Sequence, residues 1–334
     1  MNGAGEMKVA VIGDGGWGTA LAVALHNNGH DVTVWGPFAE NIEAIQRDGV
    51  NTAFLPGIPL PQNIKWTADS AEAVTQAQLV VLAMPTQFYR SVLETFQACI
   101  PRNATLVSVT KGLDRETHQT MTAVAAQILD NEHVAALSGP SHAEEVAQGI
   151  PTAVVAAATN ARDQETVQQA VNGGNLRVYT SNDITGVQIG GALKNVIAIA
   201  VGISDGMGFG DNTRAALITR GLVEITRLGT ALACQPATFA GLSGMGDLIV
   251  TCTSRHSRNR GVGERLGRGE SLQAITAGMR QVAEGVWNCD NALALAKEHD
   301  IDLPISQLVH QVLHGKIPPQ QAVETLMRRD AKPE

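Results

Sequence analysis

The first half of the chain alternates short β-branched apolar runs with longer runs of helical period. Lys8–Ile12 reads as a buried strand, and Gly16–Asn28 reads as a helix that Gly29 ends. Later strand-like runs are Asp31–Trp35, Leu79–Ala83, Thr105–Val109, Val134–Leu137, Thr152–Ala157 and Arg177–Tyr179. Because helical patterns separate several of these runs, we expect a mostly parallel sheet with helices on both faces.

The strand signal fades from about Asn182, and the remainder of the chain reads as helices. They are predicted near residues 183–203, 211–233, 236–241, 258–268, 271–277, 284–298, 304–313 and 318–328. We therefore expect an α/β domain over residues 1–186 and an all-α domain over residues 187–334.

A single lysine interrupts the most apolar helical stretch, Val187–Gly202. Burial of an unpaired ammonium is costly and lowers a lysine pKa, which suits Lys194 to proton transfer near neutral pH. Helical side chains lean over the preceding turn, where Gly190 and Gly191 leave a bare groove for a ligand. Alternatively, Lys194 extends to water from a partly buried helix. The stretch is too short and too interrupted to favour a membrane span.

A glycine pattern follows the first predicted strand and opens the first predicted helix. Gly13, Gly15 and Gly18 match G-x-G-x-x-G, with Gly16 and Trp17 between them. In this setting the glycines permit a tight turn, close approach of a pyrophosphate and packing of helix on strand. The pattern favours a Rossmann-type, dinucleotide-binding domain over a merely glycine-rich turn.

The residues after the second strand bear on the choice of cofactor. NAD-specific sites often carry an acid there, but this chain has Trp35-Gly36-Pro37-Phe38. The absence of an acid weakens strict NAD specificity, and no arginine or histidine marks a site for a 2′-phosphate. Phe38 remains a candidate cofactor contact.

Two more loops fall at the carboxyl ends of predicted strands, where ligands bind in open α/β sheets. Lys111 in the first loop could contact an anion or a carbonyl, or be an ordinary exposed lysine. Gly139 and Ser141 in the second loop could offer backbone donors and a hydroxyl, or mark a capped helix start.

In the helical half, Thr251–Gly261 concentrates arginines and hydroxyls. Such groups commonly hold phosphate, although a solvated charged loop would look the same. Upstream, Asp247 lies in a glycine-rich turn and could orient a substrate hydroxyl, hold Lys194 or close an Asx turn.

Composition narrows the classes of function. Hydrophobic residues make up 44% of the 334-residue chain and the net charge is −8, so a large core is expected and general attraction to nucleic acid is not. The 4 cysteines show no metal-type spacing and suit a reducing cytoplasm. We predict no metal site and no signal peptide. Without a metal, interconversion of an alcohol and a ketone needs a nicotinamide and a proton-transfer group.

Several separated motifs together resemble the bacterial-type NAD(P)-dependent glycerol-3-phosphate dehydrogenases over almost the whole chain. They are Gly15–Ala22, Ser138–Glu145, Gly190–Val196, Ala216–Gly221, Gly246–Leu248 and His256–Asn259.

This resemblance implies reversible reduction of dihydroxyacetone phosphate to sn-glycerol 3-phosphate for phospholipid synthesis, with NADPH/NADP or NADH/NAD as cofactor. It casts Lys194 as the proton-transfer residue and places Lys111 between cofactor and substrate. It implies substrate contacts from Gly139, Ser141, Asp247, Ser257, Arg258 and Asn259, and dinucleotide contacts from Gly16, Trp17, Ala143, Arg258, Val282 and Glu284. It also implies a cytoplasmic homodimer with a helical C-terminal domain for substrate and dimerisation.

The chain departs from the family pattern at two places. Asp14 stands in the phosphate-binding turn where a small residue is usual, so its carboxylate must point away from the pyrophosphate or weaken binding. Pro37-Phe38 stands where relatives often carry histidine or arginine, which leaves the preferred cofactor open. Two other functions also remain open: a dehydrogenase for a 3-hydroxy acid or sugar acid, and a nicotinamide-binding redox sensor without turnover.

Overall fold

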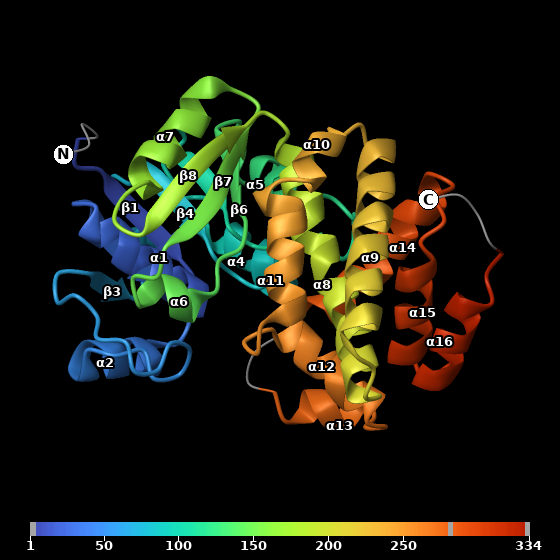
Figure 1. Ribbon diagram of the computed structural model, residues 1–334. Coiled ribbons are helices and arrows are strands. Elements are labelled where there is room, and N and C mark those ends of the chain that lie inside the picture. Colours follow the sequence, from blue (N-terminus) through green and yellow to red (C-terminus); the bar gives the residue numbers. More distant parts are fainter. Residues whose placement is uncertain (1–4, 280–282, 331–334) are drawn as a thin grey trace. The chain divides into compact units, whose positions relative to one another are not determined.

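In the computed structural model, which describes residues 5–279 and 283–330, the first half of the chain forms an eight-stranded sheet (Figure 1). The strand order is β3-β2-β1-β4-β5-β6-β7-β8, and only the β6–β7 pair is antiparallel. The order of its first six strands is that of a dinucleotide-binding sheet. The strands are β1 Lys8–Ile12, β2 Asp31–Trp35, β3 Lys65–Thr67, β4 Leu79–Leu82, β5 Thr105–Ser108, β6 Val134–Ser138, β7 Thr152–Ala158 and β8 Leu176–Ser181.

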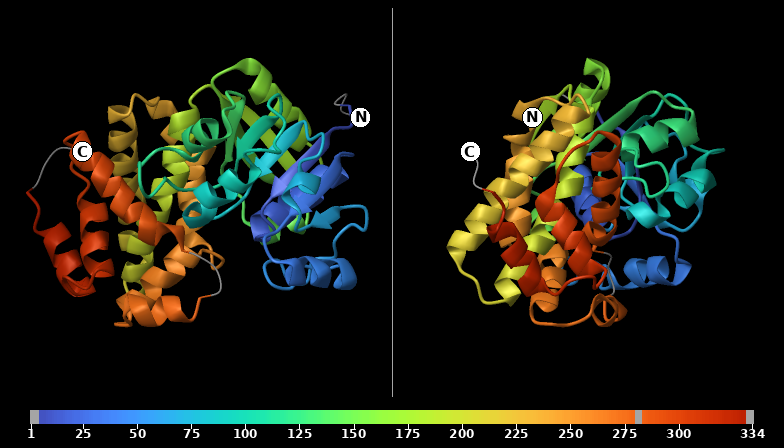
Figure 2. Two further views of the ribbon diagram at one scale, coloured as in Figure 1. Left: turned by 180° about the vertical axis from the view of Figure 1, so that it is seen from behind. Right: turned by 90° about the vertical axis from the view of Figure 1, so that its right-hand side faces the viewer.

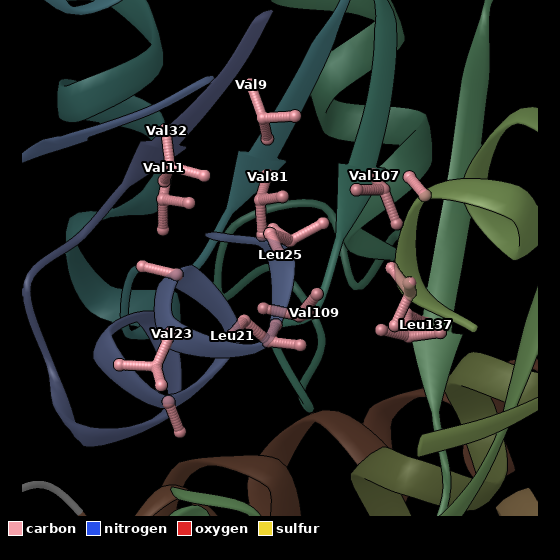
Figure 3. Packing of buried hydrophobic residues seen from close by; sticks show 14 of the residues in the cluster. Val9, Val11, Leu21, Val23, Leu25, Val32, Val81, Val107, Val109 and Leu137 are labelled. Carbon is pink, nitrogen blue, oxygen red and sulfur yellow. The ribbon is translucent and has the colours of Figure 1, made fainter. Parts of the chain in front are cut away.

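Helices cover both faces of this sheet, as the sequence predicts. They are α1 Gly16–Asn27, α2 Ala39–Asp48, α3 Ser70–Ala73, α4 Thr86–Phe96, α5 Met121–Leu129, α6 Ala143–Ala147 and α7 Ala161–Val171. Alternate residues of β1 enter two separate cores: Val9 and Val11 pack in the cluster that includes α1, whereas Ala10 and Ile12 pack in the cluster that includes α4 and α5. Figure 3 shows strand valines facing the leucines of α1 in the first cluster.

The second half of the described chain is helical. Its helices are α8 Ile184–Gly206, α9 Asp211–Ala231, α10 Pro236–Phe239, α11 Asp247–Thr253, α12 Arg258–Gly267, α13 Leu272–Ala277, α14 Glu284–Glu298, α15 Pro304–Leu313 and α16 Pro319–Met327, with a π-helical turn, η1, at Leu242–Gly246. Both views in Figure 2 show α14, α15 and α16 side by side.

The contacts divide the chain into two compact units. The sheet unit ends at Gln188 and the helical unit starts at Ile189, inside α8; the short segment Arg115–His118 also belongs to the helical unit. Among the described helices α8 is the one long and apolar enough to cross a membrane, and its apolar window is entirely buried in the protein. It is therefore a core helix, as expected of an apolar helix without a membrane role.

Glycines let α8 and α12 approach closely within the helical unit. A Cβ atom at Gly263 would lie 2.1 Å from the Ile199 carbonyl oxygen, and one at Gly202 would lie 2.0 Å from the Arg260 carbonyl oxygen. Only glycine fits at these positions without a shift of backbone. This packing fixes the start of α12, with Ser257 and Asn259, against the helix that carries Lys194.

The structure differs from the sequence prediction at two segments. β3 is a three-residue strand, too short to give a periodic signal. The segment from Gly244 to Asp247, predicted as a turn, is the end of η1 and the first residue of α11, so Thr251 and Thr253 are helical rather than in a loop. Glycines have low helix propensity, and here tertiary packing overrides it.

Candidate functional site

The glycines of the turn between β1 and α1 differ in what surrounds them. Gly13 has a φ of +121°, and a Cβ atom there would lie 2.6 Å from the Ala83 carbonyl oxygen. A Cβ atom at Gly18 would lie 2.0 Å from the Gly13 carbonyl oxygen. A Cβ atom at Gly15 would meet nothing within 4 Å. Gly13 and Gly18 are thus required for packing, whereas Gly15 leaves free the space that a ligand would need.

The start of α1 offers donors to that space. Gly15 occupies the N-cap position, and no side chain caps the helix. Its first backbone amides can therefore receive an anion. Trp17 Nε1 is buried and has no hydrogen-bond partner in the described part of the chain. Gly16 lies near Ala143, because a Cβ atom at Gly16 would be 3.7 Å from the Ala143 Cβ atom.

The side chain of Asp14 points to the end of β2. A Cβ atom at Gly36 would lie 2.6 Å from both Cγ and Oδ2 of Asp14, and Asn41 Nδ2 donates to that Oδ2 at 2.6 Å. Burial raises the pKa of Asp14, which the bond from Asn41 partly opposes. Phe38, beside this position in sequence, is 64% exposed.

The sequence did not single out Asn51, which supports the same turn. It is fully buried, and its Nδ2 donates to the Asp14 carbonyl at 2.7 Å and to Thr19 Oγ1 at 2.9 Å. No sequence spacing marks such a residue, because it reaches the turn from a loop after α2.

Three candidates at the carboxyl ends of β5 and β6 come together in the sheet unit. Lys111 Nζ donates to the Gly139 carbonyl at 2.7 Å and to Ser141 Oγ at 3.2 Å. Ser141 Oγ also donates to the Gly139 carbonyl at 2.9 Å. Gly139 has a φ of +139°, which favours glycine. Hydrogen bonds to the Gly139 carbonyl and to Ser141 Oγ thus hold the ammonium of Lys111 at the strand ends.

In the helical unit, Lys194 is buried and forms an ion pair with Asp247. The side chains are 7% and 1% exposed, and Lys194 Nζ donates to Asp247 Oδ1. Lys194 therefore does not extend to water. A buried ammonium needs such a partner, because burial of an unpaired charge is costly.

The expected bare groove below Lys194 is not bare at Gly190. A Cβ atom at Gly190 would lie 2.6 Å from the Ser243 carbonyl oxygen. The missing side chain thus admits the backbone of η1 rather than a ligand. Since Asp247 follows η1 directly, this packing brings its carboxylate to Lys194.

Amides continue the polar cluster from this pair. Asn259 Nδ2 donates to Asn195 Oδ1 at 2.9 Å, and Asn259 Oδ1 accepts from the Gly285 amide at 2.9 Å. Asn195, next to Lys194 in sequence, is 5% exposed and was not a sequence candidate for the site. Its signal was present, because it is a second polar residue in an apolar helix.

The arginine and hydroxyl cluster separates into different environments. Ser257 caps α12 by accepting from the Arg260 amide at 3.2 Å, and Arg258 is the exposed first residue of that helix. Arg260 instead pairs with Asp205, whose side chain is 6% exposed, at 2.7 Å, so its role is structural. Glu284 begins α14, and Val282 lies outside the described residues.

Two family models match most of the chain. The model described as NAD-dependent glycerol-3-phosphate dehydrogenase N-terminus matches residues 8–164, and the model for the C-terminus of the same enzyme matches residues 183–324.

Individual proteins give the same result. A glycerol-3-phosphate dehydrogenase [NAD(P)+] of Trichlorobacter lovleyi is 50% identical over 331 residues, covering 98% of this chain and 99% of the relative. One of Geobacter sp. is 47% identical, covering 98% of both chains. The crystal structure of glycerol-3-phosphate dehydrogenase from Coxiella burnetii is similar with a TM-score of 0.92 and 37% identity, covering 97% of this chain and 99% of that one.

Proposed function

Because the chain belongs to the NAD-dependent glycerol-3-phosphate dehydrogenase family, we propose that it interconverts dihydroxyacetone phosphate and sn-glycerol 3-phosphate with NADPH/NADP or NADH/NAD. The observation that carries this proposal is the buried pair of Lys194 and Asp247. Reduction of a ketone needs a proton donor for the oxygen, and a lysine held as an ammonium is one.

Lys194 is the proposed proton donor in the direction of reduction and the base in the direction of oxidation. Asp247 holds its ammonium in one position and has the acceptor that a substrate hydroxyl needs. Hydride transfer to the ketone produces an alkoxide. This alkoxide is a stronger base than the amine of Lys194, so the proton moves from the ammonium to the alkoxide. The pair therefore combines orientation with proton transfer.

The residues of the sheet unit fit a nicotinamide dinucleotide. The space at Gly15, the uncapped start of α1 and the unsatisfied Trp17 Nε1 all suit a ligand rich in acceptors. The bound cofactor would supply or accept the hydride. We assign its contacts to Gly13, Gly15, Gly16, Trp17, Gly18, Phe38, Lys111, Ala143, Arg258, Val282 and Glu284.

Substrate recognition rests on hydroxyl, amide and cationic groups. Ser257, Arg258 and Asn259 are grouped at the start of the ten-residue helix α12, where backbone amides also favour an anion. We assign the phosphate of the substrate to this group. The further substrate contacts are assigned to Lys111, Gly139, Ser141, Lys194 and Asp247.

Several properties complete the proposal. Residues 1–186 would bind the dinucleotide, and residues 187–334 would bind substrate and dimerise. The enzyme would act in the cytoplasm as a homodimer and supply sn-glycerol 3-phosphate for phospholipid synthesis. Size-exclusion chromatography with light scattering tests the dimer.

Steady-state kinetics with dihydroxyacetone phosphate and either NADPH or NADH tests the function. We expect oxidation of at least one cofactor with formation of one sn-glycerol 3-phosphate per cofactor. Turnover of 3-oxo acids or sugar acids in preference to the phosphate would favour the related dehydrogenase. Tight dinucleotide binding with no turnover on any ketone phosphate would favour a redox sensor.

A further inference from the structure

An acid reaches the end of β2 from another part of the chain. In NAD-binding sheets a carboxylate at this point accepts hydrogen bonds from the ribose hydroxyls. The segment after β2 in this chain, Gly36-Pro37-Phe38, has no acid of its own. The carboxyl group of Asp14 fills the volume that a side chain at position 36 would occupy, because a Cβ atom there would lie 2.6 Å from Asp14 Cγ.

The neighbouring residues keep that carboxyl group in place. Gly13 N donates to the Trp35 carbonyl at 2.9 Å, which joins the turn to the end of β2. Asn41, in the first turn of α2, donates to Asp14 Oδ2, and Asp14 is only 5% exposed. Asp14 therefore cannot swing away without losing its hydrogen bond from Asn41.

The charges at this position disfavour a phosphate. The residues from Gly36 to Asn41 include no cation, and Glu40 adds a second acid in the first turn of α2. A 2′-phosphate needs a cationic partner and would instead meet a carboxylate, whereas a 2′-hydroxyl can donate to one.

We propose that Asp14 sets the cofactor preference of this chain, selecting NAD(H) over NADP(H) by taking the place of the missing acid of β2. This inference rests on the proposed function only in assuming that the turn binds a nicotinamide dinucleotide. Asp14 acts on the ribose end of that cofactor and not on the reaction.

Binding of NAD+ and NADP+ to the full chain, measured by calorimetry, tests this proposal without turnover. We expect the wild type to bind NAD+ at least roughly tenfold more tightly than NADP+. Asp14→Ala should bring the two dissociation constants closer, chiefly through tighter binding of NADP+. Asp14→Asn keeps the volume of the side chain without its charge. The ratio of its two dissociation constants should lie between that of the wild type and that of Asp14→Ala. Glu40→Gln, which removes an exposed charge nearby, is the matched control and should change the ratio less than Asp14→Asn.

Two results would overturn the selectivity. One is a wild type that binds NADP+ as tightly as NAD+; the other is an Asp14→Ala variant that folds, by circular dichroism, with an unchanged ratio. Either result would leave the dehydrogenase activity intact and so would separate this inference from the proposed function. Failure to bind either dinucleotide would instead contradict the proposed function.

A different observation concerns α14 and α15. Asp290 of α14 faces His310 of α15 and His314 at the C-cap of that helix, with Oδ1 3.3 Å from His310 Nε2 and 3.2 Å from His314 Nε2. These ligand atoms all lie within 4.8 Å of one another. The edge of a zinc tetrahedron with bonds of about 2.0–2.1 Å is about 3.3 Å, so the two distances from Asp290 match such an edge.

The cluster is accessible and chemically suited to a metal. Its side chains are 24%, 45% and 48% exposed, which leaves room for water as a further ligand. Imidazoles coordinate a metal through a ring nitrogen that carries no proton, so metal binding competes with protonation of these histidines. Two imidazoles and one carboxylate form a donor set that Zn²⁺ and Co²⁺ accept.

We infer that Asp290, His310 and His314 form a surface site for a divalent transition metal of the Zn²⁺ class. Titration of the EDTA-treated full chain with Co²⁺ and Zn²⁺ tests it. One equivalent of Co²⁺ should bind with the visible absorption of a tetrahedral site and be displaced by Zn²⁺.

Variants identify the ligands. His310→Ala and His314→Ala should each weaken binding at least roughly tenfold, with Asp290→Asn close behind. His299→Ala, at the exposed end of α14, is the matched control and should bind like the wild type. Equal binding by His310→Ala and the wild type, or no stoichiometric binding by the wild type, would show that Asp290 only accepts hydrogen bonds from the two imidazoles.

Discussion

The glycine turn of the sheet unit and the Lys194 cluster of the helical unit are built in opposite ways. The turn presents backbone: its key position, Gly15, has empty space where a side chain would be. The Lys194 cluster presents side chains that are almost wholly buried and already paired with one another. A side chain added on the ligand side of a backbone site blocks the ligand. Removal of one charged side chain from a buried ion pair leaves the other charge buried without a partner. Substitutions should separate these two modes.

The largest expected effect is that of Lys194→Ala. Loss of a positioned proton donor should lower the turnover number by roughly 10²–10⁴-fold, with dinucleotide binding nearly unchanged. Steady-state kinetics and calorimetric titration of the cofactor measure the two effects. Lys297→Ala, an exposed lysine on α14, is the control. Near-normal turnover in Lys194→Ala would end the role proposed for this residue.

Gly15→Ala should weaken dinucleotide binding, which Lys194→Ala leaves nearly unchanged. The added methyl group meets no protein atom, so the free energy of unfolding should hold within about 0.5 kcal/mol, while dinucleotide affinity falls by roughly tenfold or more. Gly18→Ala is the contrasting variant, because its Cβ atom would overlap the Gly13 carbonyl and should destabilise the fold itself. Denaturant unfolding and calorimetry are the measurements. Unchanged affinity in Gly15→Ala would show that the open space is not the ligand space.

Gly190→Ala tests how the buried pair is assembled. The added methyl group would push η1 away from α8 and should destabilise the protein by about 1–3 kcal/mol, with a lower turnover number as Asp247 shifts from Lys194. Gly261→Ala, a glycine of α12 with nothing within 4 Å, should instead be neutral or stabilising by up to about 1 kcal/mol. Equal stability of the two variants would contradict the packing role of Gly190.

The smallest expected effect is the pH dependence of stability at Asp14. Burial raises the pKa of Asp14, so its contribution to stability is fully present below the unfolded pKa near 3.8 and is lost as pH rises through the folded value. Asp14→Asn does not titrate. The unfolding midpoint of Asp14→Asn, measured from pH 4 to pH 7, should therefore rise relative to that of the wild type as pH rises. A constant difference would mean that burial does not perturb this carboxyl group.

The periodic features of the chain were predictable from sequence. The strands of the sheet other than β3, and the helices α14 and α15, lie at or within a few residues of their predicted positions, because period and capping residues are local signals. The glycine turn was predictable for the same reason, since Gly18 packs against Gly13 a few residues away and Gly13 packs against Ala83 at the end of the adjacent strand. The short strand β3 and the π-helical turn η1 were not, because neither has the length or propensity to give a pattern.

The sequence by itself determined the fold class, the dinucleotide turn and the oddity of a lysine in an apolar helix. Only the tertiary structure decided which partner the lysine has. Asp247 reaches Lys194 because η1 packs against Gly190, and η1 is a segment whose glycines give no helical signal in the sequence. It also decided that Asp14 stands at the end of β2 and that Asp290 faces His310 of α15 and His314 at the C-cap of that helix. Local pattern records the hydrophobic period of each element, but the meeting of polar groups from distant segments depends on how those elements pack.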